Sequence, residues 1–256
     1  MNLANIRLIT FDVTNTLLNF RVPVALKYAE VAQKHGIVYE KDVLTKNLNS
    51  VMKNMMKDHP NFGRATKLGW RNWWRTVVVS TFETTSPSTD KLKLEVIADV
   101  LIKTFETEDC WEVTAGSEDL LSFLRNAHVT MGVISNFDPR LNTLLTNMKL
   151  RRYFSFVLTS YDVGFEKPRP EIFNEAVRVC GINDINSREC LHIGDNLAKD
   201  YYGATGCGWQ AVLLNARNFD KGKTDGGVNT SRVFESVTSL FEHFKKCNQN
   251  LIRRIK

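Results

Sequence analysis

The chain has 256 residues, enough to bury a large core in one domain or two, and its 43% apolar and 24% charged residues are ordinary for a globular protein. No run of about 18 apolar residues is present, which excludes a membrane span. The net charge is +6, but five positive charges and no acid lie in the last twelve residues, so residues 1–244 carry only +1 and we expect no nucleic-acid partner.

Cysteine usage indicates the compartment. The five cysteines are scattered, odd in number and form no CxxC pair, which favours reduced thiols over disulfides or a zinc site. The N-terminus runs almost directly into the apolar stretch 6–11, so we expect no signal peptide. The sequence therefore predicts a cytoplasmic or nuclear protein, which we expect to be a monomer or a weak dimer.

The first apolar run, residues 6–11, predicts a buried strand, and consecutive helices follow it. These helices are expected at 22–35, 41–57, 66–83 and 87–107, the last with Ser86 as its cap and Pro87 at its first position. The third holds Trp70, Trp73 and Trp74, for which packing between the helices is the first interpretation and a substrate wall the second.

The rest of the chain alternates strands with helices. Strands are expected at 129–134, 156–159, 190–193 and 211–214. Helices are expected after Ser117, which we predict as a cap, after Pro139, from Pro170 to Gly181, and at 233–246 behind a mobile loop, 217–232. This alternation predicts an α/β fold, a Rossmann-like parallel sheet covered on both faces. The expected division is 1–19 core, 20–111 helical cap and 112–256 core.

Residues suited to catalysis or to metal binding follow four of the predicted strands. Asp12 ends the first strand, Ser135 and Asn136 end the next, Lys167 lies beyond the third, and Asp195 and Asp200 lie beyond the fourth. Because ligands of parallel sheets bind beyond the carboxyl ends of the strands, we expect these residues to converge on one edge.

The residue types at this edge fit phosphoryl chemistry. A carboxylate that attacks phosphorus needs its own charge and the phosphoryl charge neutralised, and three carboxylates supply the hard oxygens that Mg²⁺ prefers. A lysine, a serine hydroxyl and an asparagine amide are suited to hold the remaining phosphoryl oxygens. Without a cation the three acids would raise one another's pKa, so the cluster predicts a bound divalent ion.

Four stretches carry a resemblance to a known family: "FDVTNTLL", "VISNFD", "EKPRP" and "HIGDNLAKD". In order and spacing they resemble the four motifs of the haloacid dehalogenase-like hydrolase superfamily, and the helical insertion is similar to its C1-type cap. The resemblance implies that Asp12 is the nucleophile, forms an aspartyl-phosphate and binds Mg²⁺. It makes the backbone carbonyl of Thr14, Asp195 and Asp200 further metal ligands, with Asp200 either ligating the ion or orienting its waters. It also assigns phosphoryl binding to Ser135 and Lys167, and fixation of the turn to Thr16, while the amide of Asn136 is expected from its chemistry to support the phosphoryl group.

Thr14 departs from the family pattern. Phosphatases of the superfamily carry a second aspartate at this position, which protonates the leaving group and then activates water. Threonine keeps the backbone carbonyl but has no group that titrates near neutral pH, and the loss of a general acid/base costs on the order of 10²–10⁴ in rate. Asn15, where many relatives have glycine, is a second and smaller departure.

Three hypotheses remain open at this point. The first is a Mg²⁺-dependent hydrolase of a small phosphorylated metabolite, working slowly because of Thr14. The second is a binding or regulatory protein that has kept the fold and lost the reaction. The third is a haloacid dehalogenase, which Asp195 and Asp200 disfavour because that reaction needs no metal. For two residues near the site we expect a structural rather than a catalytic role: His192 is expected to pack in the core, and Asp138 to cap the helix that follows it.

Overall fold

The computed structural model describes residues 3–86, 89–214 and 227–248. The chain forms two compact units. The core unit comprises Met1–Asn19, Val113–Asn136 and Lys149–Lys256, and the helical unit comprises Phe20–Glu112 and Phe137–Met148. Most of the predicted mobile loop and most of the basic tail lie outside the described residues.

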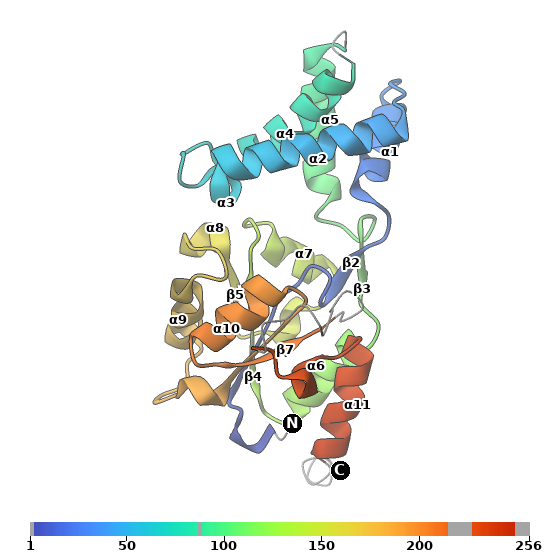
Figure 1. The fold of residues 1–256 in the computed structure, drawn as a ribbon. Coiled ribbons are helices and arrows are strands. Elements are labelled where there is room, and N and C mark those ends of the chain that lie inside the picture. Colours follow the sequence, from blue (N-terminus) through green and yellow to red (C-terminus); the bar gives the residue numbers. More distant parts are fainter. Residues whose placement is uncertain (1–2, 87–88, 215–226, 249–256) are drawn as a thin grey trace. The chain divides into compact units, whose positions relative to one another are not determined.

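A five-stranded parallel sheet is the centre of the core unit, in the strand order β5-β4-β1-β6-β7 (Figure 1). Its strands are β1 (Leu8–Phe11), β4 (Thr130–Ser135), β5 (Phe156–Thr159), β6 (Cys190–Gly194) and β7 (Gln210–Leu213). All five confirm predicted strands. The first strand, LITF, is fully buried, because it lies between β4 and β6 in a sheet whose two faces are covered.

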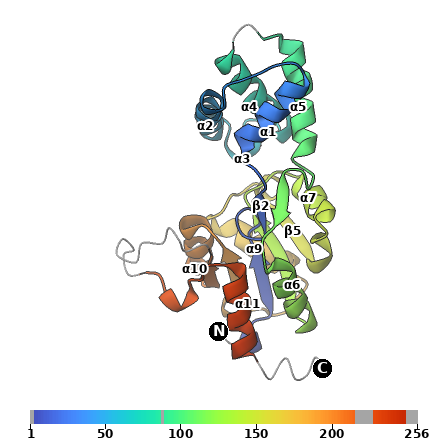
Figure 2. The ribbon, with the colours of Figure 1, turned by 90° about the vertical axis from the view of Figure 1, so that its right-hand side faces the viewer.

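Helices cover both faces of this sheet (Figures 1 and 2). Helices α9 (Pro170–Val179) and α10 (Gly203–Gly206) pack on one face, and α6 (Ser117–Asn126) packs on the other with α11 (Val237–Cys247) against it. Short helical segments complete the unit: Leu3–Asn5, Arg151–Tyr153, α8 (Ser160–Val163), Ser187–Glu189, the π-helical Leu197–Tyr202, and Thr230–Arg232. The predicted α/β fold with a helical insertion is confirmed.

The helical unit has a hydrophobic core of its own. Its helices are α1 (Val24–Lys34), α2 (Lys41–Asp58), α3 (Pro60–Gly63), α4 (Trp70–Thr85), α5 (Lys91–Thr104) and α7 (Leu141–Asn147). Trp73 is 1% exposed in this core, and its indole N–H donates to the carbonyl of His59 at 2.8 Å. The packing interpretation is therefore confirmed for Trp73. The indole of Trp74 donates instead to the carboxylate of Asp138, at 2.7 Å.

A short pair of strands, β2 (Leu18–Phe20) and β3 (Trp111–Val113), forms a separate two-stranded sheet. Neither strand is predictable from the sequence, because three residues are too few to show a period of two. None of the described helices has the length and apolar composition that a membrane span would need.

Three predicted helix starts are wrong. Helix α4 begins at Trp70 rather than 66, because Lys67 and Gly69 have positive φ angles that interrupt a helix. Helix α5 begins at Lys91, where the side chain of Asp90 accepts the backbone N–H of Leu92, so Ser86 is not its cap. In α6 the cap position belongs to Gly116, and the buried hydroxyl of Ser117 has no hydrogen-bond partner among the described residues.

Asp138 binds a backbone N–H at the start of a helix, as predicted. Its carboxylate accepts the backbone N–H of Arg140 at 3.0 Å, in the turn that leads into α7. It also accepts two N–H groups of the Arg140 guanidinium and the indole of Trp74. Asp138 is completely buried, and these donors satisfy its charge within the helical unit.

Candidate active site

A cavity of about 250 Å³ lies at the carboxyl edge of the parallel sheet. All seven residues predicted from the sequence line it: Asp12, Thr14, Ser135, Asn136, Lys167, Asp195 and Asp200. Asn15, Asn196 and Lys199 line it as well. The residues meet here because β1, β4 and β6 are parallel neighbours, so their carboxyl ends reach the same edge.

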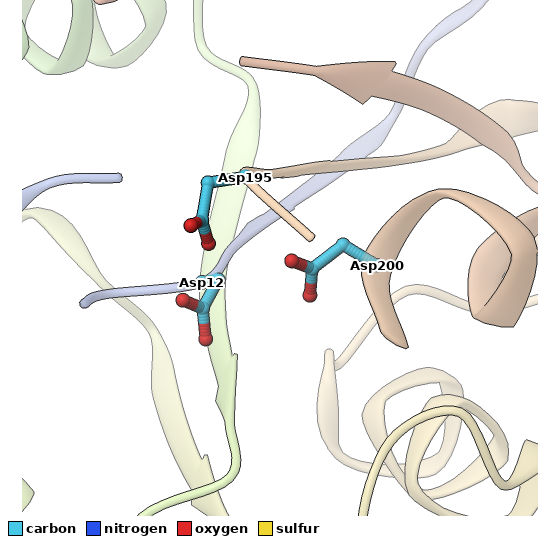
Figure 3. A group of neighbouring side chains, drawn as sticks. All are labelled: Asp12, Asp195 and Asp200. Atoms are coloured by element: carbon cyan, nitrogen blue, oxygen red, sulfur yellow. The ribbon is translucent and has the colours of Figure 1, made fainter. Parts of the chain in front are cut away.

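Three carboxylates gather in this cavity. Each of Asp12, Asp195 and Asp200 offers an oxygen, and the three oxygens lie within 4.8 Å of one another. Figure 3 shows Asp12 and Asp195 with their carboxylates close together and that of Asp200 turned toward the same space. Oxygen donors at such separations can hold a hard divalent cation.

Lys167 neutralises two of the three acids. Its ammonium lies 2.8 Å from Oδ1 of Asp12 and 2.7 Å from Oδ1 of Asp200, and its third N–H donates to the carbonyl of Ile134 at 2.7 Å. Burial by itself would lower the pKa of Lys167, but the two carboxylates outweigh it and the pKa is raised. The lysine therefore stays charged and fully hydrogen-bonded.

Asp195 has no comparable cation among the residues that the structure describes. Burial, together with the negative charges of Asp12 and Asp200, raises the pKa of Asp195 to about 6. A hydrogen bond from the side chain of Asn15 opposes this shift. A divalent cation among the three carboxylates would relieve the same repulsion, so the donor set and its charge both fit a metal ion.

Asn15 has a structural explanation that its sequence position alone does not provide. Its φ angle is 59°, in the left-handed region that glycine and asparagine adopt most readily. Its backbone N–H donates to the carbonyl of Leu18 at 2.8 Å, which closes the turn after Asp12. Asparagine thus keeps the backbone conformation that glycine would allow and adds a donor for Asp195.

Asp200 is held from several sides. It lies on the π-helical segment, whose first N–H groups are capped by the side chain of Asn196. The backbone N–H of Asn196 donates to Oδ2 of Asp200 at 2.9 Å. Glycine is required at position 194, because a Cβ there would lie 2.3 Å from Cγ of Asp200. Burial alone would raise the pKa of Asp200, but Lys167 and His192 outweigh it and the pKa is lowered.

Ser135 and Asn136 differ in their surroundings. Ser135 ends β4 and is 2% exposed. The amide of Asn136 is bound to the backbone of Lys167, since its oxygen accepts the N–H at 2.7 Å and its nitrogen donates to the carbonyl at 3.0 Å. This pair of bonds fixes the segment that carries the lysine. A contact of Asn136 with substrate stays a prediction.

Thr14 and Thr16 belong to the turn that follows β1. The backbone N–H of Thr16 donates to the carbonyl of Val13 at 3.2 Å. The buried hydroxyl of Thr16 has no hydrogen-bond partner within the described parts of the chain. Thr14 is half-buried at the wall of the cavity. No titratable side chain therefore occupies the position where the family's phosphatases carry their second aspartate.

His192 lies behind the site. It is completely buried, which confirms the packing interpretation, but it also contacts Asp200 and Thr10. Sequence reasoning misses these contacts, because they depend on the register between two strands distant in the chain. The histidine type inside an apolar strand is the one signal that the sequence offers.

A strand-end aspartate paired with a lysine, beside two further aspartates on a five-stranded parallel sheet, defines a class of hydrolase. The chain belongs to the haloacid dehalogenase-like hydrolases, whose family profile matches residues 6–208. It is 37% identical over 259 residues to the rhythmically expressed gene 2 protein of Drosophila melanogaster, with 98% of each chain covered. It is also 37% identical to human haloacid dehalogenase-like hydrolase domain-containing protein 3, over 82% of each chain.

Solved structures share the fold. The HAD-hydrolase YfnB of Bacillus subtilis, bound to magnesium, aligns with a TM-score of 0.69 at 19% identity over 94% of this chain and 99% of its own. A 2-haloacid dehalogenase of Pseudomonas syringae aligns with a TM-score of 0.62 at 22% identity over 98% of this chain and 100% of its own. Similar structures thus include a magnesium-bound hydrolase and a haloacid dehalogenase, so the fold alone does not decide the chemistry.

Proposed function

We propose that the chain is a magnesium-dependent phosphohydrolase that acts on a small phosphorylated metabolite through an aspartyl-phosphate on Asp12. The observation that carries the proposal is the arrangement of Asp12 in the cavity. One oxygen is bound by the buried Lys167, and the carboxylates of Asp195 and Asp200 stand within 4.8 Å. The five cysteines are free of disulfides and three of them are buried, which supports a reducing, cytoplasmic setting.

The residues that would hold the ion are Asp12, Asp195, the backbone carbonyl of Thr14 and, directly or through water, Asp200. The donor set is all oxygen, which suits Mg²⁺. When bound, the ion would neutralise charge on the phosphoryl group and on the attacking carboxylate. Asp200 already accepts donors on both oxygens, from Lys167, His192 and Asn196. It is therefore better suited to orienting water than to ligating the ion directly.

The reaction would take place in two steps. Because Lys167 binds Oδ1 of Asp12, Oδ2 is the oxygen that attacks phosphorus. A bond forms between Oδ2 and phosphorus while the bond from phosphorus to the leaving oxygen breaks, and the departed oxyanion takes up a proton from water. Water then attacks the aspartyl-phosphate, releases inorganic phosphate and restores Asp12. Ser135 would bind a phosphoryl oxygen throughout, and Lys167 would do so by exchanging one of its three present hydrogen bonds for a phosphoryl oxygen.

Phosphate release with and without Mg²⁺ tests the proposal. Wild type is expected to release phosphate from small phosphoesters only with the ion, and Asp12→Asn is expected to abolish release because an amide cannot form the phosphoenzyme. Asp119→Asn, an exposed change on α6, serves as the matched control and should retain activity. Release that survives Asp12→Asn would reject Asp12 as the nucleophile.

A second function is favoured by Thr14: a binding or regulatory protein that has kept the site and lost turnover. Without an acid at this position the first step must rely on a good leaving group. A broad panel of phosphoesters separates the two proposals, since a purely binding protein would show no turnover above background on any member. Chloride release from a 2-haloacid without Mg²⁺ would instead indicate dehalogenation.

A further inference from the structure

Thr10 and His192 form a buried polar pair inside the parallel sheet. They face each other in the register of β1 and β6, and both are completely buried. The hydroxyl of Thr10 lies 2.8 Å from Nδ1 of His192. Neighbouring positions of the two strands are apolar, among them Ile9, Phe11 and Ile193. A polar pair at this depth is costly unless both partners are satisfied.

The second ring nitrogen points at the active site. Nε2 of His192 lies 3.1 Å from Oδ1 of Asp200. An ionised carboxylate can only accept, so Nε2 must carry hydrogen. Within the described parts of the chain, Nδ1 of His192 is the one hydrogen-bond partner that the structure gives the completely buried hydroxyl of Thr10. The hydroxyl hydrogen is satisfied when it points at Nδ1, and Nδ1 is then the acceptor of this pair.

The hydrogen bonds therefore run in one direction, from Thr10 through His192 to Asp200. The ring of Phe173 stands edge-on to the imidazole, with centroids 5.5 Å apart and planes at 89°, and limits its rotation. Oδ1 of Asp200 receives His192 and Lys167, while Oδ2 receives the N–H of Asn196. The imidazole contributes a directional neutral donor that a lysine alone would not provide.

We propose that Thr10 and His192 are positioning residues, which fix the orientation of Asp200 toward a divalent cation and its waters by locking the histidine as the Nε2–H tautomer. The inference rests on the proposed function, since it concerns the same carboxylates. Partners that orient acidic groups at metal sites commonly account for about 10–100-fold in metal affinity.

The test measures Mn²⁺ binding to the full chain by electron paramagnetic resonance, without substrate. Mn²⁺ takes the same oxygen ligands as Mg²⁺ and is visible to the method. His192→Leu removes the donor and is expected to weaken Mn²⁺ binding about 10–100-fold. His192→Gln carries an amide N–H with a reach similar to that of Nε2 and is expected to restore most of the affinity.

Thr10→Val is the second variant. It keeps the shape of the threonine and removes only the hydroxyl, so the ring is free to place its hydrogen on Nδ1 and to turn a lone pair toward Asp200. We expect weaker Mn²⁺ binding and, in ¹⁵N spectra of the imidazole, a loss of the single Nε2–H form seen in wild type. Thermal midpoints in EDTA check that each variant is folded, and Thr10→Val decides the question if His192→Leu is not.

The outcomes separate the two proposals. Equal Mn²⁺ affinity in wild type, Thr10→Val and His192→Leu would overturn the positioning role while leaving the metal site intact. An Nδ1–H tautomer in wild type would also overturn it. Absence of Mn²⁺ binding in wild type would overturn the proposed function itself, and with it any role of His192 toward the ion.

Discussion

Because of Thr14, the site is better equipped for nucleophilic attack than for proton transfer to the leaving group or from water. Asp12, the proposed nucleophile, its lysine partner and the candidate metal ligands all line the cavity, but the wall at position 14 holds a hydroxyl rather than an acid. A threonine hydroxyl neither donates a proton readily at neutral pH nor removes one from water. The leaving group must then depart with its charge poorly neutralised, so turnover should depend strongly on leaving-group acidity.

Thr14→Asp is expected to raise turnover of an alkyl phosphate, such as glycerol phosphate, by about 10²-fold, because an alkoxide needs a general acid. Turnover of p-nitrophenyl phosphate should rise less, because its leaving group is already stable as an anion. Thr14→Asn is the control, because asparagine has nearly the shape of aspartate but cannot donate or accept a proton as an acid or base. Steady-state rates are compared at saturating Mg²⁺, so that a change in metal affinity does not affect the comparison. Equal rates for the Asp and Asn variants would contradict a missing acid as the limiting defect.

We expect Lys167 to stabilise the fold in addition to serving the proposed chemistry. It is 3% exposed and lies between the carboxylates of Asp12 and Asp200. Lys167→Met removes the cation and leaves two buried carboxylates facing each other, which is expected to lower the free energy of unfolding by about 3–5 kcal/mol. Urea denaturation in EDTA measures this loss.

Lys199→Met is the matched control, since Lys199 lines the same cavity but is exposed. Its free energy of unfolding should stay within about 0.5 kcal/mol of wild type. If the two methionine variants were equally stable, the buried ion pairs would not contribute to the folded state.

At the scale of elements, sequence patterns predict that a helix or strand is present better than they predict the residues at which it begins and ends. The five strands of the sheet are predictable because a parallel strand buried on both faces needs an unbroken apolar run, as in LITF of β1. Helix starts fail where several capping residues compete. Ser86 and Asp90 both suit a cap, and only the structure shows that Asp90 accepts the N–H of Leu92.

The start of α5 offers a direct measurement. Asp90→Ala removes the acceptor of the Leu92 N–H and is expected to destabilise the chain by about 1 kcal/mol. Asp90→Asn retains an oxygen at the cap and should lose only a fraction of that amount. Chemical denaturation of the three proteins gives the comparison. An alanine variant as stable as the asparagine variant would show that this cap does not stabilise the helix.

The candidate site likewise has features that the sequence predicts and features that it does not. Asp12, Ser135, Lys167 and Asp195 are predictable because each follows a strand, and parallel strands end at a shared edge. The hydrogen bonds from Asn136 to the backbone of Lys167, and from His192 to Asp200, are not. They depend on side-chain directions and on strand register, which no local spacing in the sequence encodes.

At the scale of the whole molecule, each unit protects its own apolar side chains. Tyr28, Trp73 and Phe82 belong to the core of the helical unit, and Leu8, Phe173 and Trp209 belong to that of the core unit. Each unit also buries a cysteine, Cys110 in the helical unit and Cys190 in the core unit. The two thiols can therefore report on the folding of the two units separately.

Burial raises the pKa of the Cys190 thiol to about 12 and that of the Cys110 thiol to about 11. Because the thiolate is the reactive form, each would present on the order of 10⁻³ or less of its population for alkylation at pH 8, even before steric protection. Cys247 is exposed at the end of α11. Iodoacetamide at pH 8 is therefore expected to modify Cys247 in the folded protein and to leave Cys110 and Cys190 unmodified until urea unfolds their units. Peptide mass spectrometry across a urea series follows each cysteine, and modification of Cys190 in the absence of urea, at the rate of Cys247, would contradict a stably folded core unit.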